Sequence, residues 1–551
     1  MEQVKNFIEK VENLNFSFWQ IFFLLFINFF LRTFFENFVN SNNLGRLNGF
    51  TDTIFVYASW WYCVFSLVIL VFYLLTRAEL KRVATIVAVF SFILYLPSLI
   101  DMIIYGSQGH IYNFIIGSYS ELVNFFLTVL VPVKVISWGI KIEVWAAVIL
   151  AGIYIFIKTK RVARTVFGLL FVYFSIFLFL TVPVHMTAIF QGISGNDGVI
   201  NSQTVAKFYL ISDQHNSRTA FRTSVMDFNT FENPTIQKDK NRYSETLSMF
   251  LLICNLIIFS LLYFLFQAKK FFEIVKNFRL TRIIHYFFLT SLGVYFGWVF
   301  SGQGKFIGSL YDLLSLFSLF LAILFAWLFA VWENDEVDKE IDAISSPGRP
   351  FVNGALEKAE WRDIKFIFLL FALSFAWLAG FYALTFIAVY ILIYHIYSTP
   401  PLRLKRFLGI SSLLVAINAL LAVWAGFFLF SGTENLGDFP LKYSLGILAI
   451  YLLAENVKNI KDIEGDRLAG IKTLPVLLGE KNGKIFVGLM VFLAALLVPF
   501  IFFLNPITIF ISLFFGLVLF FLINRQKYEE TPVFIAYFIF AAVFIFAMIV
   551  L

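Results

Sequence analysis

Charged side chains are scarce in this chain of 551 residues: Asp, Glu, Lys and Arg make up 14% of it. A soluble domain has about 25% of such residues. Hydrophobic residues make up 60% of the chain, and the mean hydropathy is +0.84. A soluble protein of this length could not bury so much apolar surface, so a soluble fold is excluded for most of the chain. We therefore expect a polytopic membrane protein, with membrane lipids as its solvent.

Cysteine is almost absent. Cys63 and Cys254 both lie in apolar runs and neither has a CxxC partner, so the sequence predicts neither a disulfide nor a cysteine metal site. The net charge is +7, but the basic residues occupy short loops between apolar runs and form no basic groove motif, so we expect no nucleic acid partner. Residues 1–15 carry mixed charge and do not resemble a cleavable signal.

Apolar runs of about 20 residues are long enough to span a bilayer. The first half of the chain contains six such runs, near residues 16–36, 53–75, 83–104, 143–158, 165–187 and 246–268. The second half contains about nine, near residues 283–301, 307–332, 364–379, 381–396, 408–430, 440–457, 485–503, 506–523 and 532–550. The sequence thus predicts an all-α fold of about fifteen transmembrane helices.

Two segments of the first half stand apart. The run 120–137 contains Glu121, Pro132 and Lys134, so it is open whether it spans the membrane, re-enters it or lies at its surface. The stretch 190–245 is polar and contains no catalytic pattern. Because the loops with clustered Lys and Arg should be cytoplasmic, six spans place the N-terminus inside and this polar loop outside.

The first chemical motif is Asn334-Asp335-Glu336-Val337-Asp338-Lys339-Glu340-Ile341-Asp342, at the cytoplasmic end of a predicted helix. On a helix, Asn334, Asp338 and Asp342 follow one another at four-residue spacing and share a face. Clustered carboxylates repel one another, and a bound divalent cation relieves that repulsion. Mg²⁺ favours one or two carboxylates together with phosphate oxygens. A solvated helix end is the alternative interpretation of this motif taken alone.

The second motif, Asp462-Ile463-Glu464-Gly465-Asp466, again follows an apolar helix on the same side, and its two aspartates share a helical face. Two such clusters can flank one diphosphate through bridging Mg²⁺ ions. Basic residues near the two motifs can contact phosphate oxygens, although the positive-inside bias alone would also place them in these loops. These are Arg349, Arg403, Lys405 and Lys472.

With these motifs in view, the C-terminal half resembles the UbiA superfamily of intramembrane prenyltransferases. Asn334 to Asp342 is similar to its NDxxDxxxD motif, followed by Arg349-Pro350, and Asp462 to Asp466 is similar to its DxxxD motif. The segment 470–479 also looks like the family. The resemblance implies a nine-helix bundle with a central cavity, and Mg²⁺ with diphosphate held at its cytoplasmic end.

Carried over to this chain, the resemblance implies catalytic and metal-binding roles for Asp338, Asp342, Asp462 and Asp466, with Asn334 as a further ligand to metal and substrate. It implies substrate binding by Arg349, Lys405 and Lys472, and Arg403 is a further substrate-binding candidate because of its charge and its position near Lys405. Tyr397 is added with reservation about its role, because it precedes Lys405 by eight residues where the family has four.

The resulting prediction is a Mg²⁺-dependent enzyme that transfers a polyprenyl group from a prenyl diphosphate to a lipid or aromatic acceptor, as in archaeal-type ether lipid or quinone-type biosynthesis. It would be a multi-pass protein of the cell membrane with a cytoplasmic active site. Residues 276–551 would form this domain, and residues 1–275 a multi-span region that serves docking or substrate delivery, or is a second enzyme. The alternative is a transporter or lipid-binding protein that uses the acidic clusters for cations.

Overall fold

The structure is a computed structural model that describes residues 2–14, 16–39, 55–56, 58–105, 123–124, 126–127, 137–182, 185, 234–302, 306–307, 310–433, 435–468, 470 and 472–551. The described residues form helices and connecting turns, without a strand among them, which confirms the predicted all-α class. They divide into two compact units. Unit 1 holds the described residues of 1–213, 219–268 and 307–314, and unit 2 holds those of 269–306 and 315–551.

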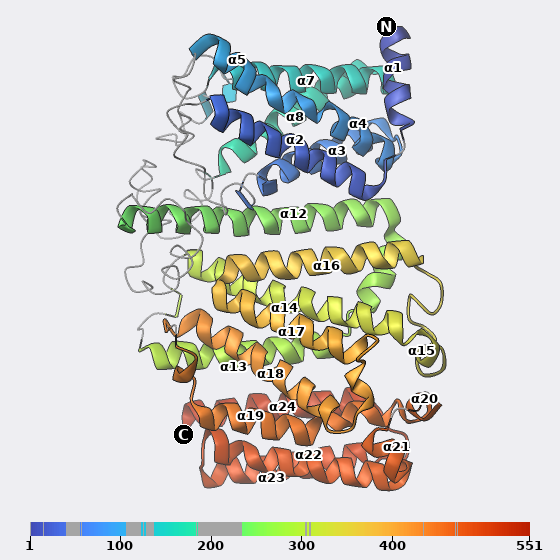
Figure 1. Ribbon diagram of the computed structural model, residues 1–551, viewed down its shortest axis with the longest axis vertical. Helices are drawn as coiled ribbons and strands as arrows, with labels where there is room; N and C mark the ends of the chain where they lie inside the picture. The colour runs from blue at the N-terminus through green and yellow to red at the C-terminus, as the bar shows by residue number, and fades with distance from the viewer. Residues whose placement is uncertain are drawn as a thin grey trace. The chain divides into compact units, whose positions relative to one another are not determined.

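Unit 1 is a bundle of apolar helices, drawn in blue to green in Figure 1. Its elements are α1 (Glu2–Glu12), α2 (Phe18–Val39), α3 (Ala58–Thr76), α4 (Leu80–Phe90), the 3₁₀ turn η3 (Ser91–Tyr95), α5 (Leu96–Tyr105), α7 (Trp138–Thr159), α8 (Val162–Leu180) and most of α12 (Pro234–Lys276). A buried ion pair joins Arg32 of α2 to Glu143 of α7 at 3.1 Å. Glu12 at the end of α1 is also buried and accepts hydrogen bonds from Tyr154 and Lys158, which attaches α1 to α7.

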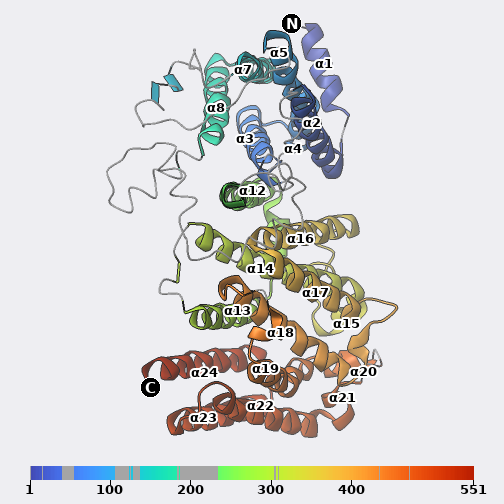
Figure 2. The same cartoon turned by 60° about the vertical axis from the view of Figure 1, so that its left-hand side comes forward.

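The described residues of unit 2 form nine long helices and several short ones, most of which lie near one end of the bundle. The long helices are α13 (Leu280–Ser301), α14 (Leu310–Val337), α16 (Lys358–Ala379), α17 (Phe381–Ser398), α18 (Ile410–Phe430), α19 (Leu441–Ala454), α22 (Glu480–Phe502), α23 (Pro506–Ile523) and α24 (Glu530–Val550). The short elements are α15 (Lys339–Ser345), η5 (Leu404–Arg406), η6 (Leu436–Asp438), η7 (Glu455–Ile460), α20 (Ile463–Leu468) and α21 (Leu474–Leu478). Figure 2 shows α19, α22, α23 and α24 packed side by side.

Twelve helices among the described residues are long and apolar enough to cross a membrane, as judged from length and composition. The predicted runs 16–36, 364–379 and 440–457 are also helices, α2, α16 and α19, but they fall outside this criterion. The predicted total of about fifteen spans therefore stays a prediction.

Two segments singled out in the first half lie largely outside the described residues. Of the run 120–137, only 123–124, 126–127 and 137 are described. Of the polar stretch 190–245, residues 190–233 are not described, whereas α12 begins at Pro234. The end of this stretch is therefore helical where a loop was expected, and proline suits such a first helical position because its missing N–H would have no partner there.

The closest helix contact in unit 2 joins α13 to α18 through glycines. A Cβ atom on Gly293 would lie 1.9 Å from the carbonyl oxygen of Val423, and one on Gly426 would lie 2.2 Å from that of Thr290. Real Cβ atoms do not approach so closely, so the two backbones can touch only because both positions lack a side chain. Such small residues are how helices pack tightly where lipid, and not water, is the solvent.

Candidate active site

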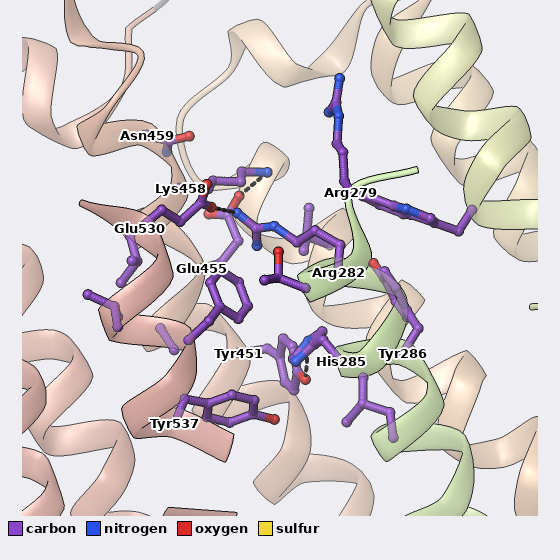
Figure 3. A pocket seen from close by; sticks show the side chains of 18 of the residues that line it. Arg279, Arg282, His285, Tyr286, Tyr451, Glu455, Lys458, Asn459, Glu530 and Tyr537 are labelled. Carbon is purple, nitrogen blue, oxygen red and sulfur yellow. Dashed lines mark hydrogen bonds and ion pairs between the residues drawn. The ribbon is translucent and has the colours of Figure 1, made fainter. Parts of the chain in front are cut away.

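Unit 2 encloses a cavity of about 630 Å³ with one polar end and long apolar walls. Its lining comes from α13, α14, α17, α18, α19, α22, α23 and α24 together with residues of the short segments that follow α14, α17 and α19. Apolar side chains line the long walls of the cavity, among them Leu289, Phe502, Phe544 and Met548. A cluster of charged side chains lines its polar end. Figure 3 shows part of this wall from close by.

The first motif brings three of its predicted residues to the charged end. Asn334, Asp338 and Asp342 all line the cavity. The motif is not one uninterrupted helix, because α14 ends at Val337 and α15 begins at Lys339. The helical register nevertheless continues across the break: the Asp338 amide donates to the Asn334 carbonyl at 2.9 Å, and the Asp342 amide donates to the Asp338 carbonyl at 2.8 Å.

Cations of the chain itself compensate much of this motif's negative charge. Lys405 donates to Asp338 and, at 3.0 Å, to the side-chain oxygen of Asn334. Arg403 donates to Asp338 at 2.9 Å. Arg349 pairs with Asp342, whose pKa is nonetheless raised to about 6, first because of burial. The first motif is therefore largely neutralised by cations of the chain, whereas the sequence predicted that a bound divalent cation would relieve the repulsion of its carboxylates.

Asp335, within the same motif, has a different environment. It is 1% exposed and does not belong to the cavity lining. It accepts hydrogen bonds from Asn277 at 2.9 Å, from Arg279 and from Arg349 at 3.1 Å. These contacts tie the start of α13 and the loop after α15 to the end of α14, so Asp335 holds the frame of the site and does not face the cavity.

The second motif contributes two carboxylates that lack such partners. Asp462 and Asp466 line the cavity, and the Asp466 amide donates to the Asp462 carbonyl at 2.8 Å. Within the described part of the chain, neither side chain has a hydrogen bond or an ion pair. Burial, followed by the neighbouring Asp462 carboxylate, raises the pKa of Asp466 to about 7, and burial raises the pKa of Asp462 as well.

The remaining predicted residues divide between the cavity and the surface. Arg349, Lys405 and Tyr397 line the cavity, and Arg403 reaches it indirectly through Asp338. The Tyr397 hydroxyl accepts a hydrogen bond from Lys458 at 2.9 Å. Lys472 is exposed and is not part of the lining; its neighbour Thr473 is, and the Thr473 hydroxyl is buried without a hydrogen-bond partner among the described residues.

Two motifs from opposite ends of the domain thus meet around one apolar cavity, as the resemblance implied. Comparison with known families matches residues 291–545 to the UbiA prenyltransferase family. The C-terminal half is a UbiA domain. The motifs predicted from the sequence lie within the matched residues, and the identification is confirmed.

Curated relatives of the UbiA domain differ in the products that their names state. Homogentisate phytyltransferase of Synechocystis is 31% identical over 198 residues, which cover 35% of this chain and 63% of that protein. Chlorophyll synthase of Arabidopsis thaliana is 33% identical over 160 residues, covering 27% and 40%. Digeranylgeranylglyceryl phosphate synthase of Sulfurisphaera tokodaii is 27% identical over 256 residues, covering 46% and 86%. The chain therefore spans less than two thirds of the first two relatives.

A solved structure of a UbiA homologue from Archaeoglobus fulgidus, bound to GPP and Mg²⁺, is 19% identical and has a TM-score of 0.40, covering 50% of this chain and 96% of that one. At this level of similarity it carries no argument about the site of the present chain.

The donor set of the UbiA domain fits a magnesium ion that is shared with a substrate. Asp462 and Asp466 offer oxygen ligands without protein partners, and Mg²⁺ favours such oxygens. No group of three or more His, Cys, Asp or Glu side chains in the described residues is close enough to hold a metal alone. An ion there would therefore complete its coordination shell with oxygens of a ligand or of water.

Several residues of the site were not singled out from the sequence. Glu455 and Lys458 form an ion pair and line the cavity just before the second motif, and Ser412 donates to Glu455 at 2.8 Å. These residues could have been found from the high density of charged residues in Glu455–Asp462. That segment was interpreted as the end of a helix followed by a basic loop. Arg279 and Arg282 precede the predicted run 283–301, and nothing in the sequence placed them at the cavity.

Proposed function

We propose that the UbiA domain transfers a prenyl group from a prenyl diphosphate to a lipid or aromatic acceptor inside the membrane, with Mg²⁺ as cofactor. The observation that carries this proposal is the cavity itself: an apolar volume of about 630 Å³ that ends at two aspartate motifs and several cations. A prenyl diphosphate has the same division, with a long hydrocarbon chain and one highly charged end.

The residues divide the task by charge. Asn334, Asp338, Asp342, Asp462 and Asp466 would hold Mg²⁺, which when bound neutralises the diphosphate and favours its departure. Arg349 and Lys405 would bind phosphate oxygens directly, and Arg403 would support them. Lys472 has no role in this proposal because it does not line the cavity. The apolar walls would exclude water from the allylic centre, which otherwise would react with it.

The proposal also concerns the membrane. The many apolar helices and the family make this chain an integral membrane protein. We place it in the cell membrane with the two motifs on the cytoplasmic side, because the loops that carry Arg349, Arg403, Lys458 and Lys481 are rich in basic residues. The prediction of a transporter or lipid-binding protein explains the acidic clusters but not their position around one end of an apolar cavity.

The test uses the full-length chain in detergent with labelled geranylgeranyl diphosphate and Mg²⁺. Geranylgeranylglyceryl phosphate serves as a lipid alcohol acceptor and homogentisate as an aromatic one, since the relatives' names point to these two classes. Release of diphosphate together with a labelled product is the expected result. If neither acceptor yields a labelled product and no diphosphate is released with either of them, the proposal is contradicted.

We further propose that the UbiA domain works without unit 1. The fragment should begin at residue 269, because Lys270 pairs with Glu360, and Asn277 with Asp335, inside unit 2. We expect residues 269–551 with a new initiator to retain prenyl transfer in detergent, within about tenfold of the full chain. A well-folded fragment without transfer would show that unit 1 contributes to the reaction.

A further inference from the structure

The wall of the cavity changes character in steps along each helix. On α13, Arg282, His285, Leu289 and Leu292 line it in succession at spacings of three and four residues, so they share one face. On α24, the order is Glu530, Tyr537 and Phe544. Charged side chains thus give way first to a narrow band of imidazole and phenol groups and then to hydrocarbon.

This band is formed by His285, Tyr451 and Tyr537, from three different helices. The Nε2 atom of His285 lies 2.8 Å from the Tyr451 hydroxyl (Figure 3). The ring centroids of His285 and Tyr537 are 5.4 Å apart. In a complex with a prenyl diphosphate, the bond between the charged and the apolar part of the substrate must lie where the charged wall ends, which is at this band.

His285 is the only imidazole that lines the cavity within the described residues. Its Nε2 meets a hydroxyl and not a carboxylate, so the ring is not held in an ion pair with Tyr451. Its Nδ1 is buried and has no hydrogen-bond partner among the described residues. A buried nitrogen without a hydrogen bond costs free energy. If the His285–Tyr451 contact served only to join α13 to α19, other side chains could join these helices without that cost.

Resting on the proposed function, we infer that Tyr451 and His285 take up the proton that a hydroxyl-bearing acceptor loses when it is prenylated. The acceptor oxygen bonds to the first carbon of the prenyl group as the bond from that carbon to diphosphate breaks. Diphosphate leaves with the bonding electron pair. The acceptor proton moves to the Tyr451 oxygen, while the Tyr451 proton moves to Nε2 of His285.

The groups around His285 include one cation, which opposes that positive charge. Arg282 lies one turn before it on α13, but Arg282 forms an ion pair with Glu530 of α24. The other groups against the ring are the phenols Tyr286, Tyr451 and Tyr537 and the phenyl ring of Phe534. None of the ring contacts of His285 in the described residues involves a carboxylate of the two aspartate motifs.

The experiment compares His285→Gln and Tyr451→Phe with Tyr443→Phe in the full-length chain. Glutamine keeps an acceptor for the Tyr451 hydroxyl but cannot take up a proton near neutral pH. Tyr443 is a matched control on α19, because it stacks on Phe296 with ring centroids 5.0 Å apart and does not line the cavity. Transfer from labelled geranylgeranyl diphosphate to geranylgeranylglyceryl phosphate or to homogentisate is measured as a function of pH.

We expect kcat with the alcohol acceptor to fall about 10²- to 10⁴-fold in His285→Gln and Tyr451→Phe, which is the usual contribution of a general base. The KM for the donor should stay within about twofold of wild type. The rate on the acid side falls in every variant as Asp466 is protonated, because its pKa is raised to about 7, so the rates are compared on the alkaline side of that fall. Tyr443→Phe should keep both the rate and the pH profile of wild type.

Three results would overturn the inference while leaving prenyl transfer intact. One is a His285→Gln variant whose rate and whose fall in rate at acid pH both equal those of wild type, which would assign His285 a purely structural role. Another is transfer by wild type to homogentisate alone, because the attacking atom would then be a ring carbon. The third, which decides the matter if His285→Gln does not fold, is a wild-type rate in Tyr451→Phe. If wild type releases no diphosphate at all, the proposed function itself fails.

Discussion

Two aspartates of the UbiA domain should respond in opposite ways to the same substitution. Asp335 accepts from Asn277, Arg279 and Arg349 and is 1% exposed, whereas Asp466 has no protein partner in the described residues and faces the cavity. We therefore expect Asp335→Asn to lower stability and Asp466→Asn to abolish transfer. Both changes remove one charge and leave the shape of the side chain almost unchanged.

The magnitudes follow from what each side chain contacts. Removing one partner of a buried ion pair costs about 3–5 kcal/mol, so the Tm of Asp335→Asn should fall by at least about 6 °C. Asp466→Asn should leave the Tm of the ligand-free protein within about 2 °C, because no protein contact is lost. Its transfer rate should fall roughly 100-fold or more, the equivalent of about 3 kcal/mol of charge stabilisation by a metal.

The assay is thermal unfolding in detergent, with and without donor and Mg²⁺. A ligand at 100 times its Kd stabilises a protein by about 2.7 kcal/mol, or about 5–11 °C in Tm. Wild type and Asp335→Asn should show this rise, and Asp466→Asn should lose most of it. A fall in the Tm of Asp466→Asn as large as that of Asp335→Asn, or an undiminished rise with ligand, would refute the assignment.

Three further predictions concern other parts of the UbiA domain. Lys405→Met removes a buried cation that contacts Asp338 and Asn334, so we expect the KM for the donor to rise about 10- to 100-fold. Lys472→Met is the control at an exposed position, and its KM should stay near that of wild type. Gly293→Val forces a side chain into the Val423 carbonyl and should prevent stable folding, read by size-exclusion chromatography. By contrast, Gly348→Ala, with open space around it and no positive φ, should give a monodisperse protein. In a background without the native cysteines, Leu436→Cys should react with an impermeant maleimide on intact cells and Lys481→Cys only after permeabilisation; the reverse pattern would invert the predicted topology.

The helices were the most predictable part of the fold. Long apolar runs must satisfy their backbone hydrogen bonds internally in lipid, so the positions of α13, α17, α22 and α23 follow from hydropathy alone. The close crossing of α13 with α18 did not follow, because a glycine in an apolar run is equally consistent with packing against lipid or against a neighbouring backbone. The helical start of α12 was missed because its first residues are polar.

The site was predictable where function depends on spacing within one segment. Asn334, Asp338 and Asp342 face the cavity together because the four-residue register survives the break at Asp338. The partners of these residues come from distant segments, as Lys405 does for Asp338. At one further position the cavity is lined by Thr473 and not by Lys472, the residue that was expected. Spacing within a motif carries no information on which distant side chains meet it, and only the three-dimensional packing brings His285 to Tyr451.

The glycine contact between α13 and α18 also fixes how the two helices are aligned along each other. Where two backbones touch, at Gly293 and Gly426, neither helix can slide along the other or rotate without a collision. The depth of the α13 side chains relative to α18 is thereby set, including Arg282, His285 and Leu289, which lie before Gly293 on the same helix. Under the proposed function, substrates of different length or shape would have to be accommodated by changes on α19, α22 or α24, so α13 would set where the reaction occurs and the other helices would determine which substrates fit.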